Sequence, residues 1–320
     1  MEHRTNETPL LQTIGLQKYF KVRGNSLLHA VDGIDLTLYS GQTLGVVGES
    51  GCGKSTLGRT ILKLIEPTGG QILYNGKDIT KLSTRKMHPY RKEMQIIFQD
   101  PYSSIDPRKS VIEVIAEYML IHKVYKTQAE AFNRAAELMD LVGLARRYTN
   151  SYPHELDGGR RQRIGIARAL SLNPRFIVCD EPVSALDVSI QAQILNLLMD
   201  LQDELDLAYM FVTHDLSVVK HISDSIMVMY LGQCVEYAKT EDLFSGNLRF
   251  QEKIINFLTN FGEIGGTSGK TKLHSFIFYN VSGQIQKKDA KMISGDIQSD
   301  GKPIIRSGTQ RSGSAATGGL

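Results

Sequence analysis

The sequence predicts an α/β fold with a buried parallel sheet and an inserted group of helices. Short β-branched runs alternate with longer helical patterns from about residue 10 to residue 240. The runs near Val47, Cys179 and Thr213 are apolar almost throughout, which is typical of parallel strands buried on both faces. Residues 102–150 break this alternation with two helical patterns and no strand between them. Strands that alternate with helices indicate a layered α/β core, and the break indicates a helical insertion.

The expected elements follow in chain order. Residues 15–38 predict antiparallel strands, with Gly24 and Asn25 at a turn. Apolar and β-branched runs predict strands at 43–47, 71–74, 94–98, 176–179, 209–213 and 225–230. Helical patterns predict helices at 55–63, 111–125, 127–142, 160–171 and 190–204.

The composition changes near residue 260. We expect residues 1–260 to form one domain, with a helical subdomain at about 102–170, followed by a flexible tail at 261–320. The tail is rich in Gly and Ser and ends in RSGTQRSGSAATGGL, a composition that cannot bury much apolar surface. One apolar island, residues 275–281, could form a strand.

Overall composition excludes several classes of protein. Of 320 residues, 41% are hydrophobic and 22% charged, as in an ordinary globular protein. The net charge of +3 is too small to require a nucleic-acid partner. No apolar stretch approaches the roughly 20 residues that span a bilayer, and the N-terminus has no secretory apolar region, so we expect a cytosolic chain. Cys52, Cys179 and Cys234 follow no metal-binding spacing.

Residues 48–55, GESGCGKS, match the phosphate-binding pattern GxxxxGK[ST] between a predicted strand and a predicted helix. Glycines at 48, 51 and 53 let successive N–H groups point at phosphate oxygens, and the helix adds its dipole. Lys54 would reach the β- and γ-phosphates, and Ser55 would bind Mg²⁺. The flanking strand and helix argue against a chance glycine-rich turn. The residues expected to contact nucleotide are Gly48, Glu49, Ser50, Gly51, Cys52, Gly53, Lys54, Ser55 and Thr56.

A metal-binding carboxylate is expected at the end of the run FIVCDE. Its four apolar residues lead into Asp180 and Glu181, where α/β sheets place their ligands. We expect Asp180 to hold Mg²⁺ through water and Glu181 to polarise an attacking water. The fold class is therefore that of a P-loop NTPase.

At this point the sequence resembles the ATP-binding subunits of ABC transporters over roughly residues 10–258. Besides the two nucleotide motifs, it has IIFQDPYSSIDPR, LDGGRRQR, SALD and FVTHD in the order of that family. The resemblance implies that Gln99 contacts Mg²⁺ and the attacking water, that His214 holds the γ-phosphate, and that Asp187 contacts a second ATPase subunit. It also implies that Phe20 stacks on adenine, with Tyr19 as the alternative, although either aromatic could simply belong to the core.

The segment that resembles the family's LSGGQ signature departs from it. This chain has Leu156, Asp157, Gly158, Gly159 and Arg160. A carboxylate beside a triphosphate is repulsive unless it is neutralised; two unit charges about 4 Å apart interact by about 4 kcal/mol at an effective dielectric of about 20. Arg160 and Arg161 are the candidate compensators, and protonation of Asp157 is the alternative. The resemblance implies that this segment completes the partner's ATP site in a dimer. The altered segment then favours a heterodimer with two unequal sites, and a homodimer would have to tolerate two altered signatures.

The resemblance is strongest to the oligopeptide, dipeptide and nickel importers, on FQDPYSSIDPR, SALDVSIQAQILNLL and YLGQCVEY. It implies a peripheral ATPase at the cytoplasmic face of the membrane. The chain would bind ATP and Mg²⁺ and act with two permease subunits, whose coupling helix would enter a groove formed by the helical insertion and the Gln99 loop. An external solute-binding protein would take part indirectly. The alternative is a soluble ABC-type ATPase that acts on nucleic acid or ribosomes.

Overall fold

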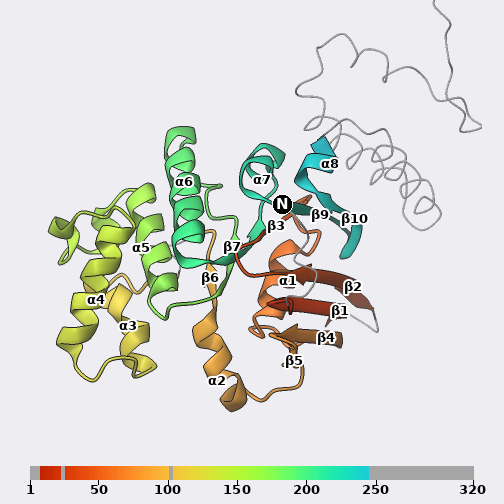
Figure 1. The fold of residues 1–320 in the computed structure, drawn as a ribbon, viewed down its shortest axis with the longest axis horizontal. Coiled ribbons are helices and arrows are strands. Elements are labelled where there is room, and N and C mark those ends of the chain that lie inside the picture. Colours follow the sequence, from red (N-terminus) through yellow and green to blue (C-terminus); the bar gives the residue numbers. More distant parts are fainter. Residues whose placement is uncertain (1–7, 23–25, 101–103, 245–320) are drawn as a thin grey trace, which may run out of the picture. The chain divides into compact units, whose positions relative to one another are not determined.

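The computed structural model describes residues 8–22, 26–100 and 104–244, all within the first of the two units into which the chain divides, Met1–Phe276. Its elements form two sheets and the helices that pack against them (Figure 1). The predicted turn at Gly24 and Asn25, the boundary near residue 260, the tail and its apolar island lie outside the described residues.

The larger sheet has six strands in the order β10-β9-β3-β8-β7-β6. The four central pairings, from β9 to β6, are all parallel, and β10 runs antiparallel to β9. The strands are β3 (Thr43–Gly48), β6 (Met94–Ile97), β7 (Phe176–Asp180), β8 (Ala208–Val212), β9 (Ser225–Tyr230) and β10 (Gln233–Lys239). Every residue of β3, β7 and β8 is buried, which confirms the parallel strands predicted from the apolar runs.

The smaller sheet is antiparallel, in the order β2-β1-β4-β5. Its strands are β1 (Leu11–Lys21), β2 (Leu27–Leu38), β4 (Gly69–Tyr74) and β5 (Lys77–Asp78). It packs across α1 (Lys54–Ile61) against the larger sheet, through a shared core that includes Leu16, Ile34, Leu57, Val178 and Met210. This arrangement brings β1 and β2 to the loop between β3 and α1.

The predicted helical insertion is confirmed as a group of helices. It contains α3 (Val111–Ile121), α4 (Gln128–Leu141), the 3-10 turns η1 (Arg146–Tyr148) and η2 (Pro153–Glu155), and α5 (Gly158–Leu170). These helices share a second core with α6 (Val188–Leu205) and the adjacent face of β7 and β8. In Figure 1 they lie on the opposite side of the larger sheet from the antiparallel strands.

The predicted elements agree with the structure to within a few residues, with some differences. The first helix of the insertion ends at Ile121 rather than at residue 125, because His122 caps it and Val124 already turns back to Met119. The sequence patterns missed four short or weakly patterned elements. These are α2 (Thr84–Glu93), which contains Pro89 and buries only Met87, β5, α7 (Leu216–Ile222) and α8 (Thr240–Phe244). They also missed β10. Among the described residues no helix combines the length and apolarity needed to cross a membrane.

Candidate nucleotide-binding site

The glycine-rich loop joins β3 to α1, as the sequence predicts. Gly48 ends β3, and Gly53 lies directly before α1 with φ of 108°. A Cβ atom on Gly53 would overlap the carbonyl oxygen of Ala30, and one on Gly48 would overlap that of Met229. Gly53 therefore satisfies a left-handed backbone and a close approach of β2 at once. Close contacts with β2 and β9 therefore help to fix the conformation of the loop.

Lys54 is directed into this loop. Its Nζ donates to the carbonyl oxygens of Gly48 and Glu49, both at 2.8 Å, and the residue is 5% exposed. The Sγ of Cys52 lies 4.0 Å from the same Nζ, and burial raises the pKa of that thiol. A buried thiol with a raised pKa is a poor nucleophile.

Asp180 lies at the end of β7 beside the start of α1. One carboxylate oxygen accepts from the Ser55 Oγ at 2.6 Å, and the other accepts from the Arg59 Nη2 at 3.2 Å. The Asp180 side chain is 3% exposed, whereas that of Arg59 is 46% exposed, so the carboxylate is buried and its cationic partner is partly in water. The sequence reasoning missed Arg59. Its spacing of four residues from Ser55 puts both side chains on one face of α1 and could have revealed it.

These donors fit a magnesium ion. A serine hydroxyl and an aspartate carboxylate are oxygen ligands, and Mg²⁺ is usually held by one or two carboxylates together with substrate phosphates. Within residues 8–22, 26–100 and 104–244, no group of three or more His, Cys, Asp or Glu side chains could cage a metal by itself. The donor set is therefore that of an ion shared with a nucleotide.

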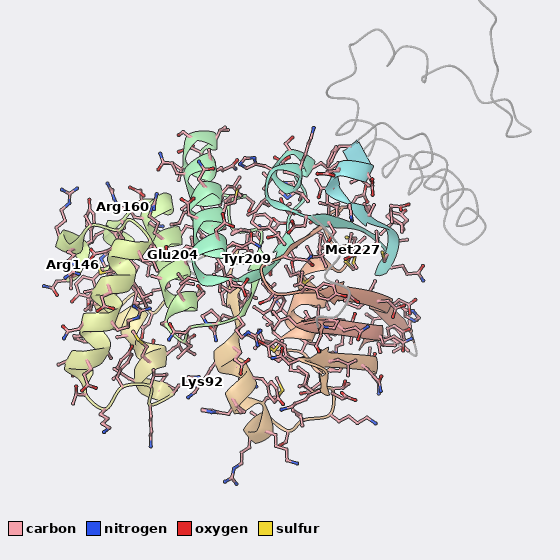
Figure 2. All side chains as sticks on the ribbon, in the orientation of Figure 1. Lys92, Arg146, Arg160, Glu204, Tyr209 and Met227 are labelled. Atoms are coloured by element: carbon pink, nitrogen blue, oxygen red, sulfur yellow. The ribbon has the colours of Figure 1, made fainter. Side chains whose placement is uncertain are left out.

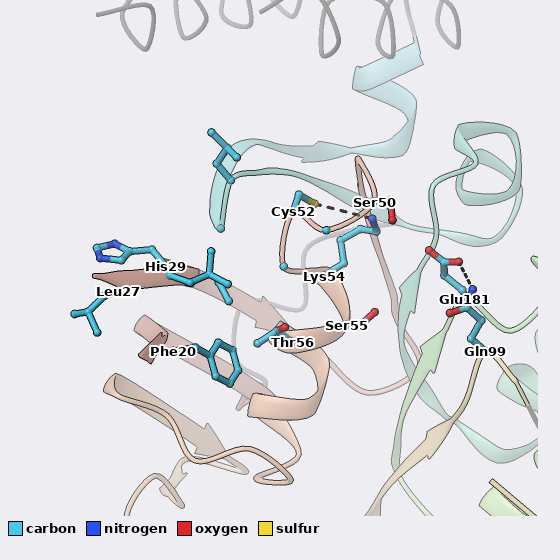
Figure 3. Close-up of a pocket in the computed structure, with 16 residues that line it drawn as sticks. Phe20, Leu27, His29, Ser50, Cys52, Lys54, Ser55, Thr56, Gln99 and Glu181 are labelled. Atoms are coloured by element: carbon cyan, nitrogen blue, oxygen red, sulfur yellow. Dashed lines mark hydrogen bonds between the residues drawn. The ribbon is translucent and has the colours of Figure 1, made fainter. Parts of the chain in front are cut away.

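Glu181 follows Asp180 and is held from two sides. Its Oε2 accepts from the Gln99 Nε2 at 2.9 Å, and its Oε1 lies 3.4 Å from the His214 Nδ1 (Figure 3 shows the first contact). Gln99 follows β6 and His214 follows β8, so three parallel strands supply the three residues. Glu181 has φ of 50°. A non-glycine residue with a left-handed backbone is strained, and it keeps that conformation only because the surrounding structure holds it there.

A cleft of about 540 Å³ runs along the glycine-rich loop. Seven of the nine predicted loop residues, Ser50 to Thr56, line it together with Gln99, Glu181 and Phe20. Tyr19 is engaged elsewhere: its hydroxyl donates to Asp32 and its ring stacks on His29, with centroids 3.9 Å apart. Of the two aromatics proposed for adenine, the cleft is therefore lined by Phe20.

The cleft also has lining residues that the sequence reasoning missed. They come from β2 and from the turn between β9 and β10, and they are Leu27, Leu28, His29, Ala30, Leu231 and Gly232. The Gly232 N–H donates to the Cys52 carbonyl oxygen at 2.9 Å and ties this turn to the glycine-rich loop. No local sequence pattern indicates these residues, because tertiary packing alone brings them to the cleft. Figure 3 shows Phe20 and His29 on the strands beside the loop.

The LDGGR segment lies at the start of α5 and does not line this cleft. Asp157 is the N-cap: its Oδ1 accepts from the Arg160 N–H at 2.8 Å, and its Oδ2 pairs with the Arg160 guanidinium. Arg161 instead donates to the carbonyl oxygens of Pro153 and Leu156. Of the two candidate compensators, Arg160 pairs with Asp157 in this arrangement, whereas the Arg161 Nε bonds to the backbone before the helix.

The glycines of that segment pack against the segment that contains Asp187. A Cβ on Gly159 would lie 2.7 Å from the Ile190 Cγ2, and one on Gly158 would lie 3.1 Å from the Leu186 Cδ2. Asp187 is exposed at the start of α6, and the neighbouring Val188 is 82% exposed. The two predicted partner-contacting segments thus adjoin each other on the surface.

This fold and site define an ATP-binding cassette, the nucleotide-binding module of P-loop NTPases that energise transport. Residues 31–184 match the family described as ABC transporter. A relative from Bacillus subtilis (strain 168), the oligopeptide transport ATP-binding protein OppF, is 51% identical over 240 residues, which cover 75% of this chain and 78% of the relative. The chain belongs to the ABC transporter family.

Further comparisons agree. The dipeptide transport ATP-binding protein DppF of Haemophilus influenzae is 48% identical over 250 residues, 75% of this chain and 76% of that protein. A solved dimeric ATP-binding cassette in a post-hydrolysis state, bound to ADP and Pi, has a TM-score of 0.66 and 27% identity, and the match covers 72% of this chain and 98% of that one. The predicted family and fold class are confirmed, and the chain is an ATPase that uses ATP and Mg²⁺.

Proposed function

We propose that this chain is the ATP-hydrolysing subunit that energises peptide import through a membrane transporter. The observation that carries the proposal is 51% identity over 78% of an oligopeptide transport ATP-binding protein. Several relatives of about 50% identity carry peptide-transport names, which favours peptides over nickel-type solutes. The comparisons give no support to a soluble ATPase that acts on nucleic acid or ribosomes.

The site residues would divide the work of ATP hydrolysis as follows. Lys54 and the loop N–H groups would hold the β- and γ-phosphates, while Ser55 and Asp180 would hold Mg²⁺, which neutralises phosphate charge when bound. Nζ of Lys54 would exchange the carbonyl oxygens of Gly48 and Glu49 for phosphate oxygens. Desolvation around Asp180 strengthens its attraction for cations.

Glu181 would accept the proton of the attacking water. Its carboxylate oxygens are used by Gln99 and His214 in the described arrangement. Each carboxylate oxygen has two lone-pair positions, so Glu181 can keep both contacts and still accept from a water molecule. We expect nucleotide to draw Gln99 toward Mg²⁺ and His214 toward the γ-phosphate.

The chain would work at the cytoplasmic face of the membrane with two permease subunits and a second ATPase subunit, and indirectly with an external solute-binding protein. Asp157, Gly158 and Arg160 of the LDGGR segment are exposed, as is the adjoining Asp187. Their exposure supports a contact with another ATPase subunit, since none of them lines the cleft of its own chain. Because Asp157 replaces the hydroxyl of the family signature, we propose a heterodimer in which the partner's ATP site is the weaker one.

The test is Glu181→Gln in the complete transporter reconstituted in vesicles. We expect nucleotide binding to persist while ATP hydrolysis at this site falls by about 10²–10³, or about 3–4 kcal/mol of barrier, and labelled peptide uptake falls with it. Glu204→Gln is the matched control, because Glu204 is an exposed glutamate on α6 outside the cleft. Normal hydrolysis in the Glu181 variant would contradict the catalytic role, and hydrolysis without peptide uptake in the unmodified complex would contradict the transport role.

A further inference from the structure

A strongly basic segment lies outside the nucleotide site. Residues 77–92 contain six lysines and arginines and a single acid, Asp78, for a net charge of +5. The whole chain carries +3, so the rest of it is net negative. Most of this segment is α2, whose only buried residue is Met87. Figure 2 shows nitrogen-tipped side chains projecting from α2 and labels Lys92.

Within the part of the chain that the structure describes, no carboxylate lies within 4.0 Å of the charged groups of Lys81, Arg85, Lys86, Arg91 or Lys92, although seven other Lys or Arg ion pairs are formed there. Asp78 is the one acid of the segment, and its pKa is lowered by hydrogen bonds from Thr80 and also by the nearby charge of Lys81. Elsewhere exposed arginines of this chain do find partners, as Arg146 does with Asp140. Positive side chains that are clustered without nearby negative charge repel one another and destabilise the folded state. Such a cluster is explained by an anionic partner.

The C-terminal end of α3 adds to this cluster. The rings of His88 on α2 and His122 after α3 lie with centroids 4.5 Å apart. Burial and the nearby His88, Lys92 and Arg91 lower the pKa of His122. The His122 Nδ1 and the Arg91 Nε are buried without a hydrogen-bond partner among the described residues. Positive potential therefore concentrates where α2 meets α3.

Exposed apolar side chains accompany these charges. Leu120, Ile121 and Val124 are 36%, 60% and 39% exposed, and they alternate with Lys123 and Lys126 in the chain. Cations that surround a few projecting apolar side chains are typical of surfaces that lie on a lipid bilayer. We expect an acidic protein segment to be bound by cations placed to pair with individual carboxylates. Here the cations are spread along α2 and the residues that follow α3.

We propose that this basic face, formed by Lys81, Arg85, Lys86, Arg91, Lys92 and Lys123 with Ile121 and Val124, docks on the anionic head groups of the membrane. The proposal rests on the proposed function, which places the chain beside a bilayer. It also agrees with the predicted groove for the permease, because α3 is the first helix of the insertion that would form that groove. The lysines and arginines would bind phosphates, and the apolar side chains would enter the head-group region.

The experiment measures partition of the purified full chain to vesicles. The vesicles are phosphatidylcholine alone, or phosphatidylcholine with about one-third phosphatidylglycerol, at about 0.1 M salt and again at about 0.5 M salt. The test variant is Lys81→Gln with Arg85→Gln and Lys86→Gln. The control removes two lysines and one arginine that are exposed elsewhere, by Lys21→Gln with Arg147→Gln and Lys239→Gln. Melting temperatures check that each variant folds.

We expect the unmodified chain and the control to bind the anionic vesicles and to lose that binding at high salt. The test variant should partition about a hundredfold more weakly, since each cation near an anionic surface contributes about a fivefold factor. Equal binding by the test variant and control, equal binding to neutral vesicles, or no binding by the unmodified chain would each overturn the proposal. So would a test variant that binds vesicles normally but fails to assemble with permease in detergent, which would identify an acidic protein partner.

ATP hydrolysis in detergent separates this proposal from the proposed function. The test variant should keep its hydrolysis rate, because none of its three residues lines the nucleotide cleft. An unmodified complex that does not hydrolyse ATP would contradict the proposed function, but the chain could still bind anionic vesicles. Normal hydrolysis with equal vesicle binding by all three proteins would contradict only the membrane contact.

Discussion

The double change Asp157→Ser with Arg160→Gln tests whether the altered signature weakens the partner's ATP site. It should leave folding almost unchanged. The two side chains are 58% and 43% exposed, and exposed ion pairs contribute about 0–1 kcal/mol. Serine caps helices about as well as aspartate does, so α5 should still begin at Gly158.

The effect on the partner's site should be larger. The change removes a carboxylate and supplies a hydroxyl, and a hydrogen bond to a charged acceptor contributes about 1.5–3 kcal/mol. This corresponds to at least about a tenfold rise in turnover. Arg160→Gln alone should act in the opposite direction, because it leaves the Asp157 carboxylate without its counter-charge. The repulsion between the carboxylate and the γ-phosphate is at most about 4 kcal/mol, for charges about 4 Å apart at a dielectric of about 20. Solvent at this exposed pair reduces it, and we expect turnover to fall about tenfold.

The assay is the ATPase rate of a heterodimer in which this chain also carries Glu181→Gln, so that the partner's site supplies the signal. The matched control is Asp140→Ser with Arg146→Gln, an exposed Asp–Arg pair on another surface. We expect the ATPase rate to be highest in the double variant, intermediate in the unmodified chain and lowest in Arg160→Gln. An unchanged or lower rate in the double variant would mean that the Asp–Arg pair works as a signature, and the proposal of unequal sites would be wrong.

Three further changes test the site and the strands beside it. Lys54→Ala should weaken binding of a fluorescent ATP analogue and abolish turnover, since it removes the point charge on the β- and γ-phosphates; binding as tight as that of the unmodified chain would contradict the role. Arg59→Gln should lower the melting temperature by about 4 °C without metal, because a desolvated carboxylate loses a charged donor, and by less with Mg-ATP, whose cation replaces the lost charge; an equal loss in both conditions would exclude this link. Tyr19→Phe should cost about 1 kcal/mol in urea unfolding at pH 7. The Tyr19 hydroxyl lowers the pKa of Asp32, so this contribution is present above the usual aspartate range and is lost as the pH falls through the lowered pKa; a cost that persists at about pH 2 would contradict that assignment.

The core strands and the nucleotide loop could be predicted because their signals are local. A strand buried on both faces must be apolar along its length, as β3, β7 and β8 are. The pair Ser55 and Asp180 could also be anticipated, because both follow parallel strands whose carboxyl ends meet at one edge. Helix α2 could not, because only Met87 is buried and Pro89 interrupts its pattern.

The sequence by itself determined which residues are the candidates for contacting phosphate and metal, because that chemistry requires particular groups at fixed spacing along one loop and two strand ends. Only the tertiary structure decided which neighbours act on them. Phe20 rather than Tyr19 lines the cleft because Asp32 and His29 engage Tyr19. Arg160 pairs with Asp157 because the helix places residues three apart on one face, while the Arg161 Nε bonds to the backbone carbonyls before the helix. Which of two neighbouring residues contacts a given group depends on the distances between side chains. Those distances are set only when the chain has folded and packed.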